Sequence, residues 1–196
     1  MIRFAPKNRE LDLALRAVDS IAPEQPFWLV PAGDGVHVDV RAMSEVQLIS
    51  IRLASIDRVE DAALSVALPH HAVHLLGPLA ATADGDMPLL FEADSALWRA
   101  TNSLGTTSGA LVGAVPPEWD HWMVPPVGDM TLIDPELLGG KVLATMLCDE
   151  LPAEVGTTGE GTMLVVRTER VRLWTIALVP LRGAAQLKMA GAAQLN

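Results

Sequence analysis

The sequence predicts an α+β fold in which antiparallel sheets carry short helices on one face. Short segments of alternating apolar and polar residues follow one another, turn residues separate them, and amphipathic helical segments interrupt the run. Antiparallel strands are joined by such tight turns, whereas parallel strands need a crossover helix between them. With 196 residues, of which 50% are hydrophobic, the chain can bury a core of its own.

The first helix is expected over residues 9–20. Its apolar residues recur at the i, i+3, i+4, i+7 spacing of one buried stripe, namely Leu11, Ala14, Leu15 and Val18. The opposite face alternates in sign, with Arg9, Asp12, Arg16 and Asp19. Asn8 is the expected N-cap, and Ala22-Pro23 is the expected end of the helix.

A second short helix is expected from His70 to Leu79, opened by Pro69 at the first-turn position where proline is tolerated. Its predicted apolar stripe consists of Ala72, Leu75, Leu76 and Leu79. Pro78 limits the length of this helix or bends it.

Strands are predicted on both sides of the second helix. The expected segments before it are 27–31, 36–40, 47–53 and 64–68, and those after it are 88–93, 96–101 and 107–113. Gly33-Asp34-Gly35 marks a hairpin turn, after which Val38 and Val40 alternate with Asp39 and Arg41 as in a half-buried strand.

Residues 114–128 contain two Pro-Pro pairs and predict an extended connector without helix, held by its Trp residues against an apolar surface. The segments expected after it are a strand at 129–133, an apolar helix at 135–148, and a hairpin of strands 162–168 and 171–179.

The charge is acidic and uneven. The chain carries 14 Lys and Arg against 24 Asp and Glu, a net charge of −10, and residues 1–120 carry 8 basic and 16 acidic side chains. This balance argues against indiscriminate binding to phosphate backbones, although a locally basic wall that encloses nucleic acid remains compatible with it.

The single cysteine, Cys148, excludes an internal disulfide and a multi-thiolate zinc site. The N-terminal stretch lacks the apolar core of a signal peptide, and no apolar run reaches the roughly 18 residues that a membrane span needs. We therefore expect a cytoplasmic protein without a membrane partner.

The order of elements resembles that of the DNA sliding clamps, the superfamily of the bacterial polymerase III β subunit. The resemblance covers about residues 1–120. It is carried by a strand at Phe4, the helix from Leu11 to Val18, the Asp34-Gly35 hairpin and the turn at 42–46, the strand 64–69 that leads into the helix at 70–79, the hairpin at 97–112, and the exit at 116–119. It implies one complete clamp-like domain (1–120), an abbreviated second one (121–183) and a flexible tail (184–196).

The family implies two binding surfaces. In clamps the helices of each domain face DNA, and their basic side chains contact phosphates without reading sequence. The corresponding residues here are Lys7, Arg9, Arg16, His70, His71, His74 and Lys141. The segment 175–182 is similar to the final strand of bacterial clamps, so the resemblance implies an apolar groove for protein partners at Val179, Pro180, Leu181 and Arg182.

The chain departs from the family in length and charge. Bacterial members have three clamp domains, so a ring of six domains would need three copies of this chain, a homo-oligomer. Because Asp12 and Asp19 share a helix face with Arg9 and Arg16, we favour a solvated face of mixed charge over phosphate contact, and any binding of double-stranded DNA is expected to be weak.

His70-His71-x-x-His74 is a metal-like cluster, because His70 and His74 lie one helical turn apart and can share an ion. A third ligand would come from elsewhere, for example His37, His121 or Asp86. The spacing holds no Glu, unlike that of the H-E-x-x-H hydrolases. We favour a solvated polar face over a metal site and expect no metal and no cofactor.

Catalytic motifs are lacking. There is no Gly-x-Ser-x-Gly, no Gly-rich loop between a strand and a helix, and Cys148 lies in an apolar helix as a buried structural thiol. In the tail, Gln186-Leu187 and Gln194-Leu195 resemble peptides that dock into clamp grooves, but a tail without function is the favoured interpretation.

The leading hypothesis is thus a non-enzymatic sliding-clamp-like protein, either a DNA-encircling processivity factor of replication or a clamp-fold interaction protein. The alternative is a clamp-fold regulatory or scaffold protein that does not bind DNA. A His-dependent metal hydrolase ranks third.

Overall fold

The computed structural model describes residues 1–59, 65–81, 84–133, 153–158 and 163–176. The chain divides into two compact units, Met1–Trp122 and Met123–Asn196. The helix predicted at 135–148, with Lys141 and Cys148, lies outside the described residues, as do the predicted groove at 179–182 and the tail. No helix among the described residues is long and apolar enough to cross a membrane.

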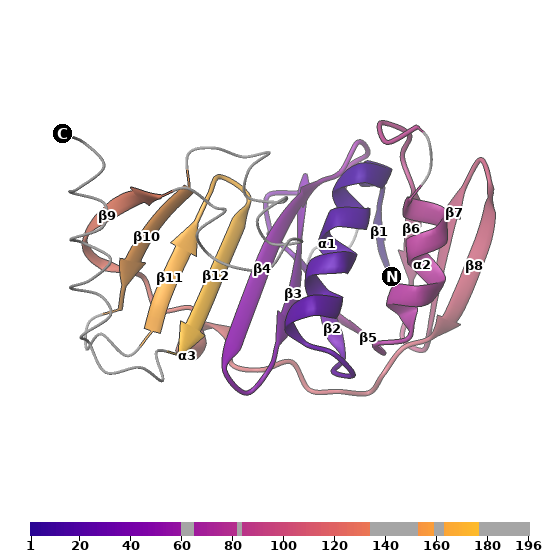
Figure 1. Ribbon diagram of the computed structural model, residues 1–196. Coiled ribbons are helices and arrows are strands. Elements are labelled where there is room, and N and C mark those ends of the chain that lie inside the picture. Colours follow the sequence, from indigo (N-terminus) through magenta and orange to yellow (C-terminus); the bar gives the residue numbers. More distant parts are fainter. Residues whose placement is uncertain (60–64, 82–83, 134–152, 159–162, 177–196) are drawn as a thin grey trace. The chain divides into compact units, whose positions relative to one another are not determined.

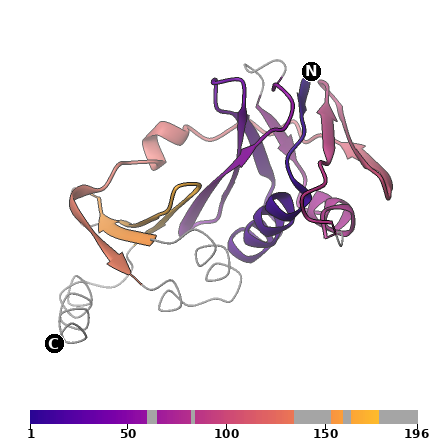
Figure 2. The ribbon, with the colours of Figure 1, turned by 90° about the horizontal axis from the view of Figure 1, so that it is seen from above.

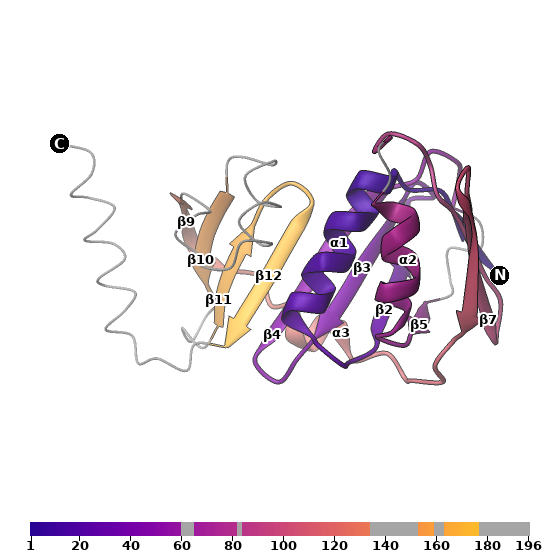
Figure 3. The ribbon, with the colours of Figure 1, turned by 45° about the vertical axis from the view of Figure 1, so that its right-hand side comes forward.

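In the described part of the first unit, two antiparallel sheets carry the helices α1 and α2, which lie side by side (Figures 1, 2 and 3). One sheet has the order β5-β2-β3-β4 and the other β1-β6-β7-β8. Helix α1 packs on β3 and β4, α2 packs on β7 and β8, and the two helices pack on each other. The strands are β1 Ile2–Phe4, β2 Phe27–Pro31, β3 His37–Met43, β4 Gln47–Ala54, β5 Val66–Leu68, β6 Leu90–Ala93, β7 Leu97–Asn102 and β8 Gly105–Ala110. The predicted α+β class is confirmed.

Helix α1 (Asn8–Ile21) follows the predicted pattern, and all four residues of its apolar stripe are buried. The predicted cap is wrong, because Asn8 is the first residue of the helix and Lys7 precedes it without a side-chain cap. Asn8 is buried, and its backbone N–H donates to the carbonyl of Met87 at 2.9 Å. A neighbouring turn therefore supplies the acceptor that a capping side chain would otherwise provide.

Helix α2 (Ala72–Ala80) begins later than predicted. The N–H groups of Ala72 and Val73 donate to the carbonyls of Pro69 and His70, so Pro69 starts a turn before the helix rather than the helix itself. The buried side consists of Ala72, Val73, Leu76 and Ala80. The predicted stripe is wrong at Leu75, which is exposed, because the packing surface of this short helix lies one residue away from the predicted line. Pro78 lies inside the helix, which ends two residues later.

Side chains close the hairpin turns of the first unit. Asp34 Oδ1 accepts the N–H groups of Val36 and His37, both at 2.9 Å, and Asp94 Oδ1 accepts those of Ala96 and Leu97. These bonds favour the ionised carboxylate, so that they lower the pKa of Asp34 to about 2 and lower that of Asp94. Both glycines that flank Asp34 have positive φ, 82° and 76°. The predicted hairpin turn is confirmed.

The segment after β8 holds a short helix, α3 (Trp119–Trp122), where the sequence predicts none. The Pro-Pro pairs lie before and after this single turn, and proline at the entry of a helix does not disturb its hydrogen bonds. Trp119 is buried and packs edge-on against Trp28, with ring centroids 5.3 Å apart. The predicted contact of the connector with an apolar surface is confirmed at this residue.

The described residues of the second unit form four antiparallel strands in the order β9-β10-β11-β12. They are β9 Val127–Ile133, β10 Ala153–Thr157, β11 Met163–Arg167 and β12 Val171–Ile176. The hairpin of β11 and β12 is the predicted one, closed by the Thr168 hydroxyl, which accepts the N–H of Val171 at 3.0 Å. Strand β10 is not predicted, because its small and polar residues (Ala-Glu-Val-Gly-Thr) show little hydrophobic alternation.

Candidate functional site

The first candidate surface is the helix face, which we define as the polar residues at the start of α1 and along it, together with those in the turn before α2 and in its first turn. It includes Lys7, Arg9, Asp12, Arg16, Asp19, His70, His71 and His74. Six of the seven residues predicted to face DNA belong to it, and the seventh, Lys141, lies outside the described residues. Arg9, Arg16 and Asp19 are exposed, and Asp12 is half-buried.

Acidic residues pair with the basic residues of this face. Arg16 Nη2 lies 2.8 Å from Asp12 Oδ2 one helical turn away, and Lys7 Nζ lies 3.0 Å from Asp86 Oδ1. Such exposed pairs stabilise a protein by about 0–1 kcal/mol each. They nevertheless neutralise charge locally, so the helix face is not the strongly basic surface that tight phosphate binding requires.

The histidines meet a carboxylate from the other helix. His70 Nε2 lies 3.1 Å from Asp19 Oδ1, and the rings of His70 and His74 are nearly perpendicular with centroids 5.7 Å apart. The potential ligand atoms of Asp19, His70 and His74 all lie within 4.8 Å of one another. The third member of this cluster is therefore Asp19, which sequence reasoning placed only on a solvated face.

The group does not include the third ligands that the sequence suggested, and each of these makes other contacts. His37 Nδ1 lies 2.7 Å from Asp34 Oδ2, Asp86 pairs with Lys7, and the ring of His121 packs against Trp122. No spacing along the chain indicates Asp19, since its place beside His70 arises from the packing of α1 on α2.

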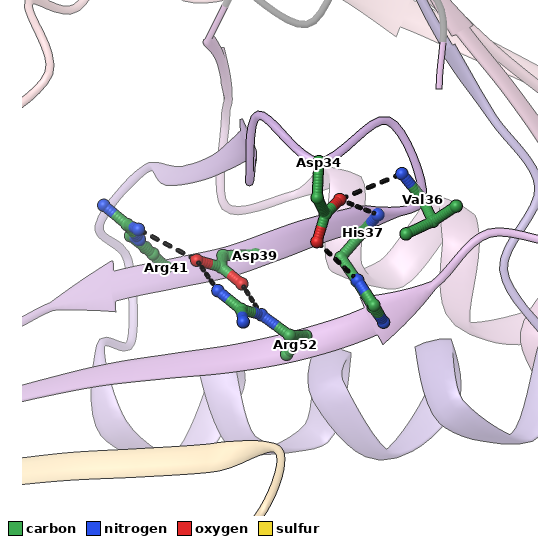
Figure 4. A network of polar contacts seen from close by, with 6 residues as sticks. All are labelled: Asp34, Val36, His37, Asp39, Arg41 and Arg52. Atoms are coloured by element: carbon green, nitrogen blue, oxygen red, sulfur yellow. Dashed lines mark hydrogen bonds and ion pairs between the residues drawn. The ribbon is translucent and has the colours of Figure 1, made fainter. Parts of the chain in front are cut away.

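The second candidate surface is the face of the β2-β3-β4 sheet that carries Asp39 (Figure 4). Asp39 Oδ2 accepts from Arg41 Nη2 at 2.9 Å, and Asp39 Oδ1 accepts from Arg52 Nε at 2.9 Å. Asp39 is 4% exposed, so its carboxylate is buried between two guanidinium groups. The hydrogen bond to Asp39 raises the pKa of Arg52 above its ordinary value.

Helix α3 contributes aromatic and polar groups beside this network. Arg41 lies over the ring of Trp119, with its guanidinium carbon 5.6 Å from the ring centroid. Such a stack adds roughly 0.5–2 kcal/mol. A cavity of about 390 Å³ is lined by Arg41, Glu118, Trp119 and His121. The sequence does not indicate the Asp39 network or the cavity beside it. The alternation in β3 indicates only that Asp39 and Arg41 share one face of a strand.

No protein-family model and no curated protein matches this sequence. The fold is similar to that of solved bacterial sliding clamps. The β subunit of DNA polymerase III from Pseudomonas aeruginosa bound to griselimycin matches 89% of the chain with a TM-score of 0.70 and 13% identity. The corresponding clamp from Bartonella birtlesii, also bound to griselimycin, matches 89% with a TM-score of 0.68 and 11% identity.

The β clamp from Helicobacter pylori bound to a DNA ligase peptide matches 89% of the chain with a TM-score of 0.62 and 10% identity. This chain spans only 64–65% of the length of these three clamps. At such identities the similarity concerns the fold, and the fold is the one that the order of elements indicated. The chain has the α+β fold of the bacterial DNA polymerase III β sliding clamps.

Proposed function

We propose that this chain is a non-enzymatic, sliding-clamp-like protein that holds double-stranded DNA by encircling it as a homo-oligomer. The observation that carries the proposal is the extent of the fold similarity, which reaches 89–90% of the chain in solved sliding clamps from several bacteria. A single shared sheet or hairpin would not extend so far. The proposed place of action is the cytoplasm, as expected from the sequence.

The proposed ring follows from the length of the chain. Residues 1–120 as one clamp-like domain and 121–183 as an abbreviated second one give two domains per chain. A ring of six domains then takes three copies, and closed rotational symmetry would make every interface between copies the same. The 64–65% coverage of the clamps that it matches agrees with two domains out of three.

The charges of the helix face favour encirclement over direct affinity. Arg16 and Lys7 are paired with Asp12 and Asp86, so few counterions would be released from DNA. A closed ring is retained on DNA by its topology and needs little affinity. We propose that Lys7, Arg9 and Arg16, with the histidines and Lys141, make weak contacts with phosphates inside the ring.

Retention on circular DNA tests this function. The protein is incubated at low salt with a nicked circular plasmid, half of the sample is linearised with a restriction enzyme, and both halves are separated by gel filtration. Encirclement predicts that the protein elutes with circular DNA and is released from linear DNA, and that light scattering gives the mass of a trimer. Equal retention on both forms, or a monomer that is retained on neither, would contradict the proposal.

Protein partners are proposed to bind at residues 179–182. The Helicobacter pylori clamp was solved with a DNA ligase peptide, and segment 175–182 is similar to the strand that lines the peptide groove of bacterial clamps. We expect Val179→Ala and Leu181→Ala to weaken binding of a labelled Gln-Leu peptide by tenfold or more, as followed by fluorescence anisotropy. Unchanged affinity in both variants would remove Val179, Pro180, Leu181 and Arg182 as the groove.

The second candidate is a clamp-fold scaffold that binds proteins but not DNA. The pairing of Arg16 with Asp12 and of Lys7 with Asp86 favours it, because it leaves the helix face without an excess of positive charge. This candidate predicts peptide binding together with a complete lack of retention on circular DNA at low salt.

A further inference from the structure

Two helices that are far apart in the sequence bring three metal-binding side chains together. Asp19 lies in the last turn of α1, His70 lies in the turn that precedes α2, and His74 lies in the first turn of α2. The ligand atoms of all three lie within 4.8 Å of one another. It is the one such group of three or more His, Cys, Asp or Glu side chains found in the described ranges.

We propose that Asp19, His70 and His74 bind a divalent transition-metal ion, with Zn²⁺ as the expected ion. Two imidazole nitrogens and one carboxylate oxygen are a donor set that Zn²⁺ uses with a water as fourth ligand. Zinc bonds of about 2.0–2.2 Å place the ligand atoms of a tetrahedron roughly 3.3–3.5 Å apart. The distance of 3.1 Å from His70 Nε2 to Asp19 Oδ1 is already close to this value.

The burial of the three side chains fits a site that closes on an ion. The His70 side chain is largely buried and fixes one ligand, whereas Asp19 and His74 are exposed and can adjust their rotamers.

A simple ion pair accounts for less of the arrangement. A hydrogen bond between His70 and Asp19 explains two of the three residues, but it does not explain why His74 places its ring against that of His70. A shared ion accounts for all three. It would also fasten α1 to α2, so it would stabilise the folded protein in proportion to the logarithm of the free metal concentration.

The test uses the full chain without a histidine tag. Zn²⁺ binding is followed by isothermal titration calorimetry, and the coordination number by the visible absorption of bound Co²⁺. We expect one ion per chain, and we expect His74→Gln and Asp19→Asn each to weaken binding by at least tenfold. His71→Gln is the matched control, because His71 is an exposed neighbour of His70 that does not belong to the group.

Thermal unfolding gives a second readout that does not depend on the heat of binding. Zn²⁺ should raise the melting temperature of the wild type and of His71→Gln, and it should leave that of His74→Gln and Asp19→Asn unchanged. Circular dichroism without metal checks that all variants fold. A wild type that binds no Zn²⁺, or a His71→Gln variant that loses as much affinity as His74→Gln, would overturn the site.

Discussion

The two faces of the first unit use the same kinds of charged residues in different ways. On the helix face, the exposed Arg16 pairs with the half-buried Asp12 one helical turn away. On the sheet, Asp39 accepts hydrogen bonds from Arg41 and Arg52 while almost fully buried. The Arg16–Asp12 pair stabilises the protein little, because water solvates its charges almost as well when the pair is broken. The buried Asp39 carboxylate needs both guanidinium groups, because water does not reach it to replace them.

The local geometry explains this difference. Asp39 and Arg52 are direct partners in the register of β3 and β4, and Arg41 follows two residues along the same side of β3. Trp119 then covers Arg41. On α1 no further layer covers the side chain of Arg16, which is more than half exposed. Burial, rather than the number of ion pairs, therefore decides which acidic residue the fold needs.

The largest expected effect comes from Asp39→Ala. It leaves Arg41 with little access to water and without its carboxylate, so we expect a loss of about 3 kcal/mol in the free energy of unfolding, measured by urea denaturation. Asp12→Ala is the matched control and should cost about 0.5 kcal/mol or less. Equal losses of unfolding free energy in Asp39→Ala and Asp12→Ala would show that burial does not determine how much each carboxylate stabilises the fold.

The second-largest effect on stability is expected from removing Trp119, whose ring lies against Arg41. Trp119→Ala exposes Trp28 and Arg41 and should cost about 2 kcal/mol, the usual contribution of one large buried side chain. Trp122→Ala changes the more exposed tryptophan of the same short helix and should cost less than half as much. A larger loss of stability in Trp122→Ala than in Trp119→Ala would show that Trp119 does not shield Arg41 and Asp39 from water.

Most of the first unit could be predicted from local patterns. The stripe of α1, the Gly-Asp-Gly turn and the hairpins depend on residues close in sequence, and their order was enough to indicate the clamp fold. The predicted α2 stripe is wrong at Leu75, because almost every residue of this nine-residue helix is apolar and the hydrophobic spacing alone does not define its packing surface.

The candidate sites could be predicted only in part. His70 and His74 were found because they lie one turn apart, but Asp19 reaches them only through the packing of α1 on α2. Asp39 was assigned to the polar side of a strand, which is correct. Its burial comes from Arg52 on the next strand and from the tryptophan cover some 80 residues further on, and neither leaves a signal in the local sequence.

The turn between β2 and β3 provides a smaller, pH-dependent test at an exposed site. The N–H of Val36 and the side chain of His37 hold the pKa of Asp34 at about 2, below its ordinary value of 3.8. A lowered pKa means that the stabilisation is complete above pH 3.8 and is lost as the pH falls through about 2.

Carboxyl chemical shifts followed by NMR should therefore place the titration midpoint of Asp34 well below its ordinary value of 3.8. The difference in stability between the wild type and Asp34→Asn should shrink over the same pH range. A midpoint for Asp34 near 3.8 would mean that the turn does not depend on its carboxylate. Such a result would limit the stabilising role of charge to the buried network.

The smallest expected effect concerns DNA and tests the exposed face. Asp12→Asn removes the partner of Arg16 and frees one cation on the helix face. The affinity for a short duplex should rise only a few-fold. The plot of log K against log salt should become steeper by about 0.9, the contribution of one additional phosphate contact. Glu45→Gln makes the same change in net charge at an exposed residue of the turn between β3 and β4 and should leave the slope unchanged. If both variants shift the affinity equally without changing the slope, the effect is one of total charge, and Arg16 is not a residue that meets phosphate.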